Sequence, residues 1–197
     1  MLAACFHNIE GFFGVPTDHL YARPVLVRKL NELADKDFVV VAPDAGAGPR
    51  AKGFAHRLGK HPTVHTYKER GSDGQIEVVK LIGEIHPGQT AVIVDDMIDT
   101  GGTIIKVAET LQSRGIGEIL AVAVHGVFSG NSVLNLIESA IDKIYFTDTI
   151  ELPMKEAALI STFDIKNKFV CVSVAELFAE AIRCTHNGES ISKLFES

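Results

Sequence analysis

The chain has 197 residues, of which 46% are hydrophobic, and this is enough to form one domain with a buried core. Its formal charge of −6 and the lack of a long basic run exclude a protein that binds nucleic-acid backbones. The three widely spaced cysteines indicate neither a disulfide framework nor a zinc site, and with no long apolar stretch and no basic N-terminal start we expect a cytoplasmic protein without a membrane segment.

Turn-forming and aromatic residues fill the segment 1–24, which predicts an irregular arm that needs an apolar surface to cover its rings. Residues 25–35 then carry valines and leucines at the spacing of an amphipathic helix. We therefore expect a main domain from residue 25 to residue 184, followed by a C-terminal tail at residues 185–197.

Residues 37–44 form an apolar, β-branched run, which predicts a central strand. A glycine-containing loop follows, and Pro49 suits the start of the next helix. We expect the backbone N–H groups from Asp44 to Gly48 to face an anion, and the Asp44 carboxylate to contact Mg²⁺ or its waters. The loop proper consists of Asp44, Ala45, Gly46 and Ala47.

The same region contains a dinucleotide-binding pattern, G-x-G-x-x-A, at Gly46, Gly48 and Ala51. We disfavour that interpretation because so short a pattern often occurs by chance and no acidic ribose-binding partner is evident at the end of a second strand. The helix after the loop also carries basic side chains that could bind a ligand, although solvated charge on an exposed face is the favoured interpretation. These side chains are Arg50, Lys52 and Arg57.

Residues 62–85 contain two strand-like halves around a polar tip at residues 69–75, which predicts a mobile hairpin. Lys68 and Arg70 form a basic pair beside this tip. Cations on a loop that closes over a site can neutralise phosphate oxygens as charge moves during group transfer. From the spacing alone, an ordinary charged hairpin tip is the favoured interpretation.

The stretch 90–103 carries the most informative pattern, because an apolar strand, two carboxylates and a glycine pair precede a helical run that Gly115 ends. The two carboxylates are expected where the strand ends, where they can accept hydrogen bonds from neighbouring hydroxyls or hold a cation. The next two polar residues can cap the helix, whose first N–H groups suit a phosphate. The predicted sugar-phosphate site consists of Asp95, Asp96, Asp99, Thr100, Gly101, Gly102 and Thr103.

The remaining chain continues to alternate, with strands expected at residues 118–124, 143–148 and 168–174 and helices after the first and the last of them. An irregular stretch is expected from the second of these strands through Phe163. His125 follows a strand directly, and one structural hydrogen bond is a more economical role for it than acid or base catalysis. The pattern predicts an α/β fold with a mostly parallel sheet and helices on both faces.

The string VDDMIDTGGT in the stretch 90–103 resembles the phosphoribosyl-pyrophosphate (PRPP) motif of ribose-phosphate pyrophosphokinases, also called PRPP synthetases. Further similar stretches are IEGFFGVPTDHLYARP, VVAPDAGA, AVHGVFSG, TDTI and AEAIRCTHNGES. The resemblance therefore spans nearly the whole chain. It implies the type I phosphoribosyltransferase fold and assembly as a homo-oligomer.

The resemblance also implies a reaction in which diphosphate passes from Mg·ATP to ribose 5-phosphate, with Mg²⁺ as cofactor, giving PRPP and AMP. Residues Thr100–Thr103 would hold the 5-phosphate, Asp95 and Asp96 the ribose hydroxyls, and the loop from Asp44 the diphosphate. In this family the pair matching Lys68 and Arg70 is taken to stabilise the transition state. Serines matching Ser190 and Ser192 bind an effector phosphate, although a frayed tail is an equally good interpretation here.

Several features depart from the family pattern. Residues 1–24 resemble the last part of an N-terminal domain that supplies most of the ATP pocket in relatives. The Asp-x-His that helps those relatives hold Mg·ATP corresponds to Ala3 and Cys5, and Glu69 replaces an arginine. We therefore expect an adenine site that is missing or supplied by another chain.

Two alternatives to a PRPP synthetase stay open. A non-catalytic regulatory or assembly subunit would explain the altered Asp-x-His, but the retained Lys68, Arg70 and full PRPP motif oppose it. A phosphoribosyltransferase that consumes PRPP is opposed by the form of the motif and by the lack of a recognisable base-binding hood.

Overall fold

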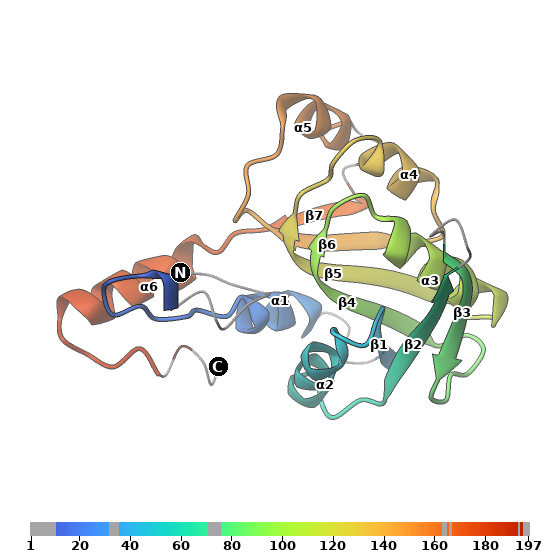
Figure 1. Ribbon diagram of the computed structural model, residues 1–197, viewed down its shortest axis with the longest axis horizontal. Helices are drawn as coiled ribbons and strands as arrows, with labels where there is room; N and C mark the ends of the chain where they lie inside the picture. The colour runs from blue at the N-terminus through green and yellow to red at the C-terminus, as the bar shows by residue number, and fades with distance from the viewer. Residues whose placement is uncertain are drawn as a thin grey trace.

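The computed structural model describes residues 11–31, 36–70, 76–162, 165, 167–192 and 194, with the side chains of 68–70 and 76–79 excepted. Within these residues, seven strands form one sheet in the order β3-β2-β1-β4-β5-β6-β7 (Figure 1). All neighbouring strands run parallel except β2 and β3. The strands are β1 (Phe38–Ala42), β2 (Thr63–Arg70), β3 (Ile76–Ile82), β4 (Thr90–Ile98), β5 (Glu118–Gly126), β6 (Lys143–Thr147) and β7 (Phe169–Val172).

Helices cover both faces of the sheet, which confirms the predicted α/β architecture. On one face, α3 and α4 pack against β-branched side chains of the central strands. On the other face, α1 and α2 do the same. The helices are α1 (Arg23–Leu30), α2 (Gly48–Arg57), α3 (Gly102–Ser113), α4 (Ser132–Glu138), α5 (Met154–Ile160) and α6 (Ala175–His186). None of these described helices is long and apolar enough to cross a membrane.

The sequence pattern explains why the central elements form. The five residues of β1 are all apolar and all buried, as expected for a parallel strand covered on both faces. In α3, the apolar residues Ile104, Val107, Ala108 and Leu111 recur at helical spacing and are at most 3% exposed. The strand and the helix therefore bury the faces that their residue order predicts.

Two element predictions were wrong. The first helix begins at Arg23 rather than residue 25, because Pro24 fits the first turn, where its missing N–H has no helical partner. The stretch through Phe163 is not irregular throughout, since α5 forms directly after Pro153. This helix has only seven residues, and Leu159 and Ile160 pack on the core from outside, so its stability depends on tertiary contacts that local spacing does not reveal.

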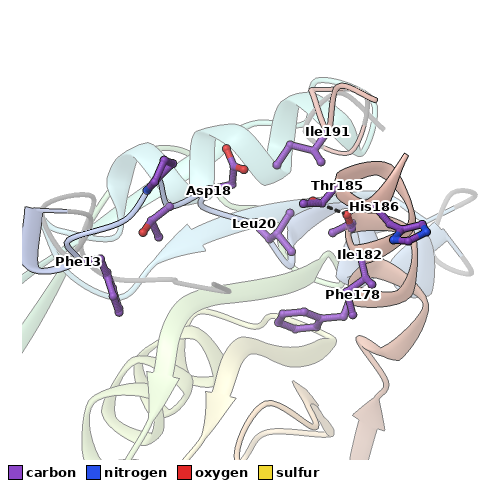
Figure 2. A pocket seen from close by; sticks show the side chains of 11 residues that line it. Phe13, Asp18, Leu20, Phe178, Ile182, Thr185, His186 and Ile191 are labelled. Carbon is purple, nitrogen blue, oxygen red and sulfur yellow. Dashed lines mark hydrogen bonds between the residues drawn. The ribbon is translucent and has the colours of Figure 1, made fainter. Parts of the chain in front are cut away.

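The N-terminal arm meets α6 at the side of the molecule rather than over the sheet (Figure 1). Leu20 is buried against Leu177 and Ala181 of α6, but Phe12 is 88% exposed, so the surface expected to cover all the aromatic rings is incomplete. A cavity of about 540 Å³ lies between the arm and α6. Figure 2 shows Phe13 and Leu20 of the arm beside this cavity, with Phe178, Ile182 and Ile191 on its other side.

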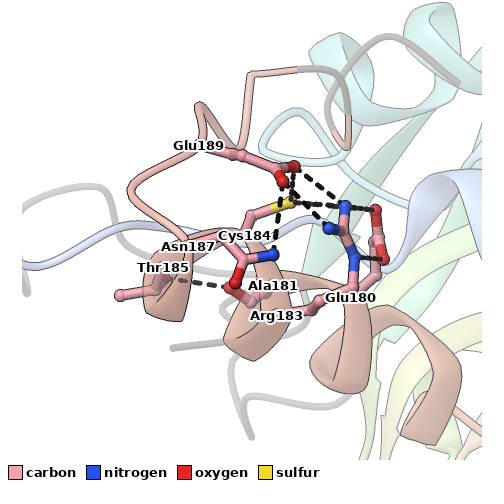
Figure 3. A network of polar contacts seen from close by, with 7 residues as sticks. All are labelled: Glu180, Ala181, Arg183, Cys184, Thr185, Asn187 and Glu189. Carbon is pink, nitrogen blue, oxygen red and sulfur yellow. Dashed lines mark hydrogen bonds and ion pairs between the residues drawn. The ribbon is translucent and has the colours of Figure 1, made fainter.

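An ion-pair network ties the residues after α6 back to that helix. Arg183 donates to Glu180 at 2.8 Å and 2.9 Å, and to Glu189 at 3.0 Å and 2.9 Å (Figure 3). The buried thiol of Cys184 lies in the same network. These exposed ion pairs contribute little stability each, but together they give the chain after α6 a defined path.

Gly126, the last residue of β5, is required by the packing of two buried rings. A Cβ at this position would lie 2.5 Å from Cε2 of Phe128 and 2.8 Å from Cδ2 of Phe146. The two rings are 1% exposed and pack edge to face, with centroids 5.1 Å apart, so neither can move without opening the core. The N–H of Phe128 also donates to the Ile98 carbonyl at 3.0 Å, which fixes the end of β4.

We expect Gly126→Ala to lower the free energy of unfolding by roughly 1–3 kcal/mol, because it overpacks a closed region of the core. Urea unfolding followed by circular dichroism measures this change. Gly14→Ala is the matched control, since no atom lies within 4 Å of the added methyl group there. Equal midpoints for the two variants would contradict the packing argument.

Candidate functional site

The acidic pair lies in the carboxyl-terminal part of β4, and the strand continues beyond the pair. β4 continues to Ile98, with Asp95 paired to Ala123 and Met97 paired to His125 of β5. The prediction that the strand ends at the carboxylates was therefore wrong by three residues. Continued pairing with β5 holds the backbone of the acidic pair extended, and Asp95 and Asp96 both remain partly buried.

The loop after β4 turns into α3 through Gly101. This residue is the N-cap of the helix and has φ 78°, a left-handed conformation that glycine adopts without strain. A Cβ there would also lie 3.3 Å from side-chain carbons of Leu136. No side chain caps α3, so the predicted capping by Asp99 and Thr100 was wrong, because the left-handed turn at Gly101 takes the N-cap position.

The uncapped start of α3 adjoins a small cavity of about 130 Å³. The first N–H groups of a helix have no partner within it and carry the positive end of its dipole, so such a cavity suits an anion. Every residue predicted for the sugar-phosphate site lines this cavity except Asp96. The lining residues are Asp95, Met97, Ile98, Asp99, Thr100, Gly101, Gly102, Thr103 and Ile104.

The loop after β1 lies next to this site because β1 and β4 are neighbouring parallel strands. Its backbone is partly committed to its own turn, since Ala47 N donates to Asp44 Oδ1 at 3.0 Å and Gly48 N donates to Ala45 O at 3.4 Å. The expectation that all N–H groups from Asp44 to Gly48 face an anion was therefore wrong for these two. The Asp44 carboxylate shapes the turn as an acceptor.

Arg50 was expected to be a solvated charge, and that expectation was wrong. Its guanidinium lies between the two carboxylates, with Nη1 3.4 Å from Asp95 Oδ1 and Nη2 3.4 Å from Asp96 Oδ2. The Arg50 side chain is 20% exposed. Helical spacing alone could not show this contact, because it depends on the pairing of β1 with β4; the only sequence signal is an arginine in the first turn after the Asp44 loop.

Burial raises the pKa of Asp95 to about 7, and the adjacent Asp96 and the nearby Asp44 carboxylate add to this effect. A backbone hydrogen bond from Asp96 N to Asp95 Oδ1, at 2.9 Å, acts in the opposite direction. One guanidinium offsets only part of the charge of two adjacent carboxylates. Near neutral pH, the protonated and the ionised forms of Asp95 are therefore both populated.

His125 makes the structural hydrogen bond that its position suggested. Its Nδ1 lies 2.7 Å from Thr149 Oγ1, and Thr149 in turn lies 3.0 Å from the buried Thr147 hydroxyl. Burial lowers the pKa of His125, against the charge of Asp96, which raises it. The ring is therefore favoured in its neutral form.

The hairpin strands were predicted correctly as β2 and β3, with Lys68 opposite Val79 and Arg70 opposite Ile76 across a register shift. The tip residues 71–75 and the side chains of Lys68 and Arg70 lie outside the described part of the structure. Ser190 Oγ donates to Ser192 Oγ at 2.9 Å beyond α6. The roles of these four residues stay predictions, as do those of Ala3 and Cys5, which lie outside the described residues.

Among the described side chains, no three His, Cys, Asp or Glu residues are grouped as a metal site. A Mg²⁺ ion in a phosphate site needs fewer protein ligands, because one or two carboxylates, phosphate oxygens and waters complete its shell. Asp44 fits this role, since it is a carboxylate at the loop beside the acidic pair. The donor set is thus compatible with a magnesium ion that a phosphate ligand shares.

Comparison with known proteins agrees with this geometry. A family model described as the phosphoribosyl synthetase-associated domain matches residues 75–196. The ribose-phosphate pyrophosphokinases of Vibrio vulnificus strain YJ016 and Caldanaerobacter subterraneus are 41% and 43% identical, and each match covers 95% of this chain and 57% of the relative. The chain spans about half the length of the curated relatives it matches.

A solved structure supports the same assignment. The crystal structure of phosphoribosylpyrophosphate synthetase from Mycobacterium smegmatis superimposes with a TM-score of 0.81 at 30% identity, over 95% of this chain and 58% of the other. The sheet order, the acidic pair and the glycine loop thus lie in a fold shared with that protein. The chain belongs to the phosphoribosyl synthetase family, whose members named here are ribose-phosphate pyrophosphokinases.

Proposed function

We propose that the chain carries the ribose 5-phosphate and diphosphate sites of a ribose-phosphate pyrophosphokinase. The observation that supports this most directly is the acidic pair of β4 beside the cavity at the uncapped start of α3. A sugar phosphate needs an anion site next to acceptors for its hydroxyls, and this arrangement supplies both. Family membership favours PRPP formation over other reactions of sugar phosphates.

In this proposal, the loop Thr100–Thr103 binds the 5-phosphate through backbone N–H groups and threonine hydroxyls. Asp95 and Asp96 accept hydrogen bonds from the 2- and 3-hydroxyls of ribose. This fixes the sugar so that its C1 hydroxyl can approach the donor nucleotide. Much of the rate enhancement in such a reaction comes from holding the two substrates in line.

The transfer forms one bond and breaks one. The C1 hydroxyl oxygen attacks the β-phosphorus of ATP, the bond from that phosphorus to the α,β-bridging oxygen breaks, AMP leaves, and the hydroxyl proton is released to solvent. The loop from Asp44 to Ala47 would hold the transferred diphosphate, and Lys68 and Arg70 would close over it from the hairpin. Mg²⁺, when bound beside Asp44, would neutralise phosphate oxygens.

A non-catalytic subunit that binds ribose phosphate without an ATP site is the second candidate. It is favoured by Ala3 and Cys5, which stand where relatives have the Asp-x-His that helps hold Mg·ATP. A phosphoribosyltransferase that consumes PRPP is a third candidate from sequence. The family match to synthetases disfavours it.

Incubation of the chain with ribose 5-phosphate, ATP and Mg²⁺ tests the proposal, with AMP and PRPP resolved by chromatography. Equimolar formation of AMP and PRPP is the expected outcome. Binding of ribose 5-phosphate without AMP formation would favour the non-catalytic subunit. Binding of neither substrate would remove the proposal altogether.

Lys68→Ala is expected to lower turnover roughly 10²–10³-fold with ribose 5-phosphate affinity unchanged, since a cation that acts on the transition state affects kcat and not ground-state binding. Steady-state kinetics and calorimetry separate the two quantities. Lys155→Ala, an exposed change on α5, is the control for loss of one positive charge. Full turnover in the Lys68 variant would remove the role given to this hairpin.

The raised pKa of Asp95 predicts how sugar binding depends on pH. Below about pH 7 the carboxyl is protonated and accepts poorly, so ribose 5-phosphate affinity should rise as pH increases through 7. The ligand phosphate has its own ionisation near pH 6. Calorimetry from pH 5.5 to 8.5 without Mg²⁺ should show both steps in the wild-type protein and only the ligand step in Asp95→Asn. Identical profiles would contradict the assignment.

A further inference from the structure

Arg50 connects the two loops that form the proposed site. It lies in the first turn of α2, directly after the Asp44 loop, and its guanidinium reaches the acidic pair of β4. All three side chains are partly buried, with exposed fractions of 20% for Arg50, 15% for Asp95 and 23% for Asp96. Shielding from water makes a charge contact stronger than it would be on an open surface.

The contact is divided between the two carboxylates. One guanidinium nitrogen faces Asp95 and another faces Asp96, each at 3.4 Å, so the rigid, planar fork relates the orientation of one carboxylate to that of the other. The pair also has local contacts, since Asp95 Oδ1 accepts from Asp96 N and Asp96 Oδ1 accepts from Met97 N. The Arg50 side chain, which comes from α2, thus contacts both carboxylates of the β4 pair.

Two adjacent carboxylates repel each other, and without a cation one of them turns away or takes up a proton. Either change removes an acceptor that a sugar with two neighbouring hydroxyls requires. A cation that spans both carboxylates opposes both changes and leaves their outer lone pairs available to hydroxyl donors.

We propose that Arg50 is a positioning residue that holds Asp95 and Asp96 as a paired acceptor and so makes the site select ribose phosphates over 2-deoxyribose phosphates. The inference rests on the proposed function, because it assigns a selectivity to the same site. Arg50 acts through the two carboxylates, whereas the phosphate is bound by the loop that precedes α3.

Calorimetric titration with ribose 5-phosphate and with 2-deoxyribose 5-phosphate tests the assignment, since the second ligand lacks one hydroxyl but keeps the phosphate. The wild-type protein should prefer the ribose ligand. Arg50→Gln should weaken ribose 5-phosphate binding roughly tenfold, the size expected when a charged hydrogen bond is lost, and leave 2-deoxyribose 5-phosphate nearly unchanged. The selectivity ratio, which is the dissociation constant for 2-deoxyribose 5-phosphate divided by that for ribose 5-phosphate, should therefore fall in Arg50→Gln.

Two further variants make the result specific. Lys52→Gln removes the same charge from an exposed position of α2 and should keep the wild-type ratio. Arg50→Lys should recover only part of it, because an ammonium group supplies the charge without the fork that spans both carboxylates. Circular dichroism confirms that each variant is folded, and Arg50→Lys provides the test if Arg50→Gln does not fold.

An equal loss of affinity for both ligands would overturn the inference, because it would mean that Arg50 contacts the phosphate or that the loop has collapsed. A selectivity ratio equal to that of the wild-type protein, in either Arg50→Gln or Arg50→Lys, would overturn the inference as well. Failure of the wild-type protein to bind ribose 5-phosphate would instead refute the proposed function and this inference with it. The wild-type titration thus reports on the function, and the variant ratios report on Arg50.

Discussion

The parallel pairing of β1 with β4 at the centre of the sheet is the constraint on which the candidate site depends. Val39 lies opposite Ala91 and Val41 opposite Ile93, and all four are fully buried between helices on both faces. Because the strands run in the same direction, the loops that follow them emerge at one edge. Hydrophobic burial in the sheet thus determines how far the Asp44 loop lies from the acidic pair.

The charges at that edge of the sheet do not balance. Three carboxylates, those of Asp44, Asp95 and Asp96, gather near one guanidinium, and burial raises the pKa of Asp95 to about 7. Such an arrangement disfavours the free protein and favours a ligand that brings hydroxyl donors or a bridging cation. Under the proposed function, ligand binding would relieve this unfavourable electrostatic energy, as is common where pKa values are strongly perturbed.

Much of this could be predicted from the sequence, because the strands and α3 follow from local periodicity. The apolar, β-branched run at residues 38–42 predicts a buried strand, and the residues that line the cavity after β4 were predicted from their types and order. What escaped prediction depends on contacts between distant elements. Arg50 is 45 residues from Asp95, and β4 extends to Ile98 only because β5 pairs with it.

The first turn of α2 contributes to the candidate site in two ways. It ends the Asp44 loop, and it carries Arg50 to the acidic pair, while Ala51 and Phe54 lock the rotation of the helix in the core. An insertion of one residue between Arg50 and Ala51 would turn the guanidinium by about 100° around the helix axis relative to these core residues. The position of the arginine relative to the core residues of α2 therefore decides whether its guanidinium faces the acidic pair.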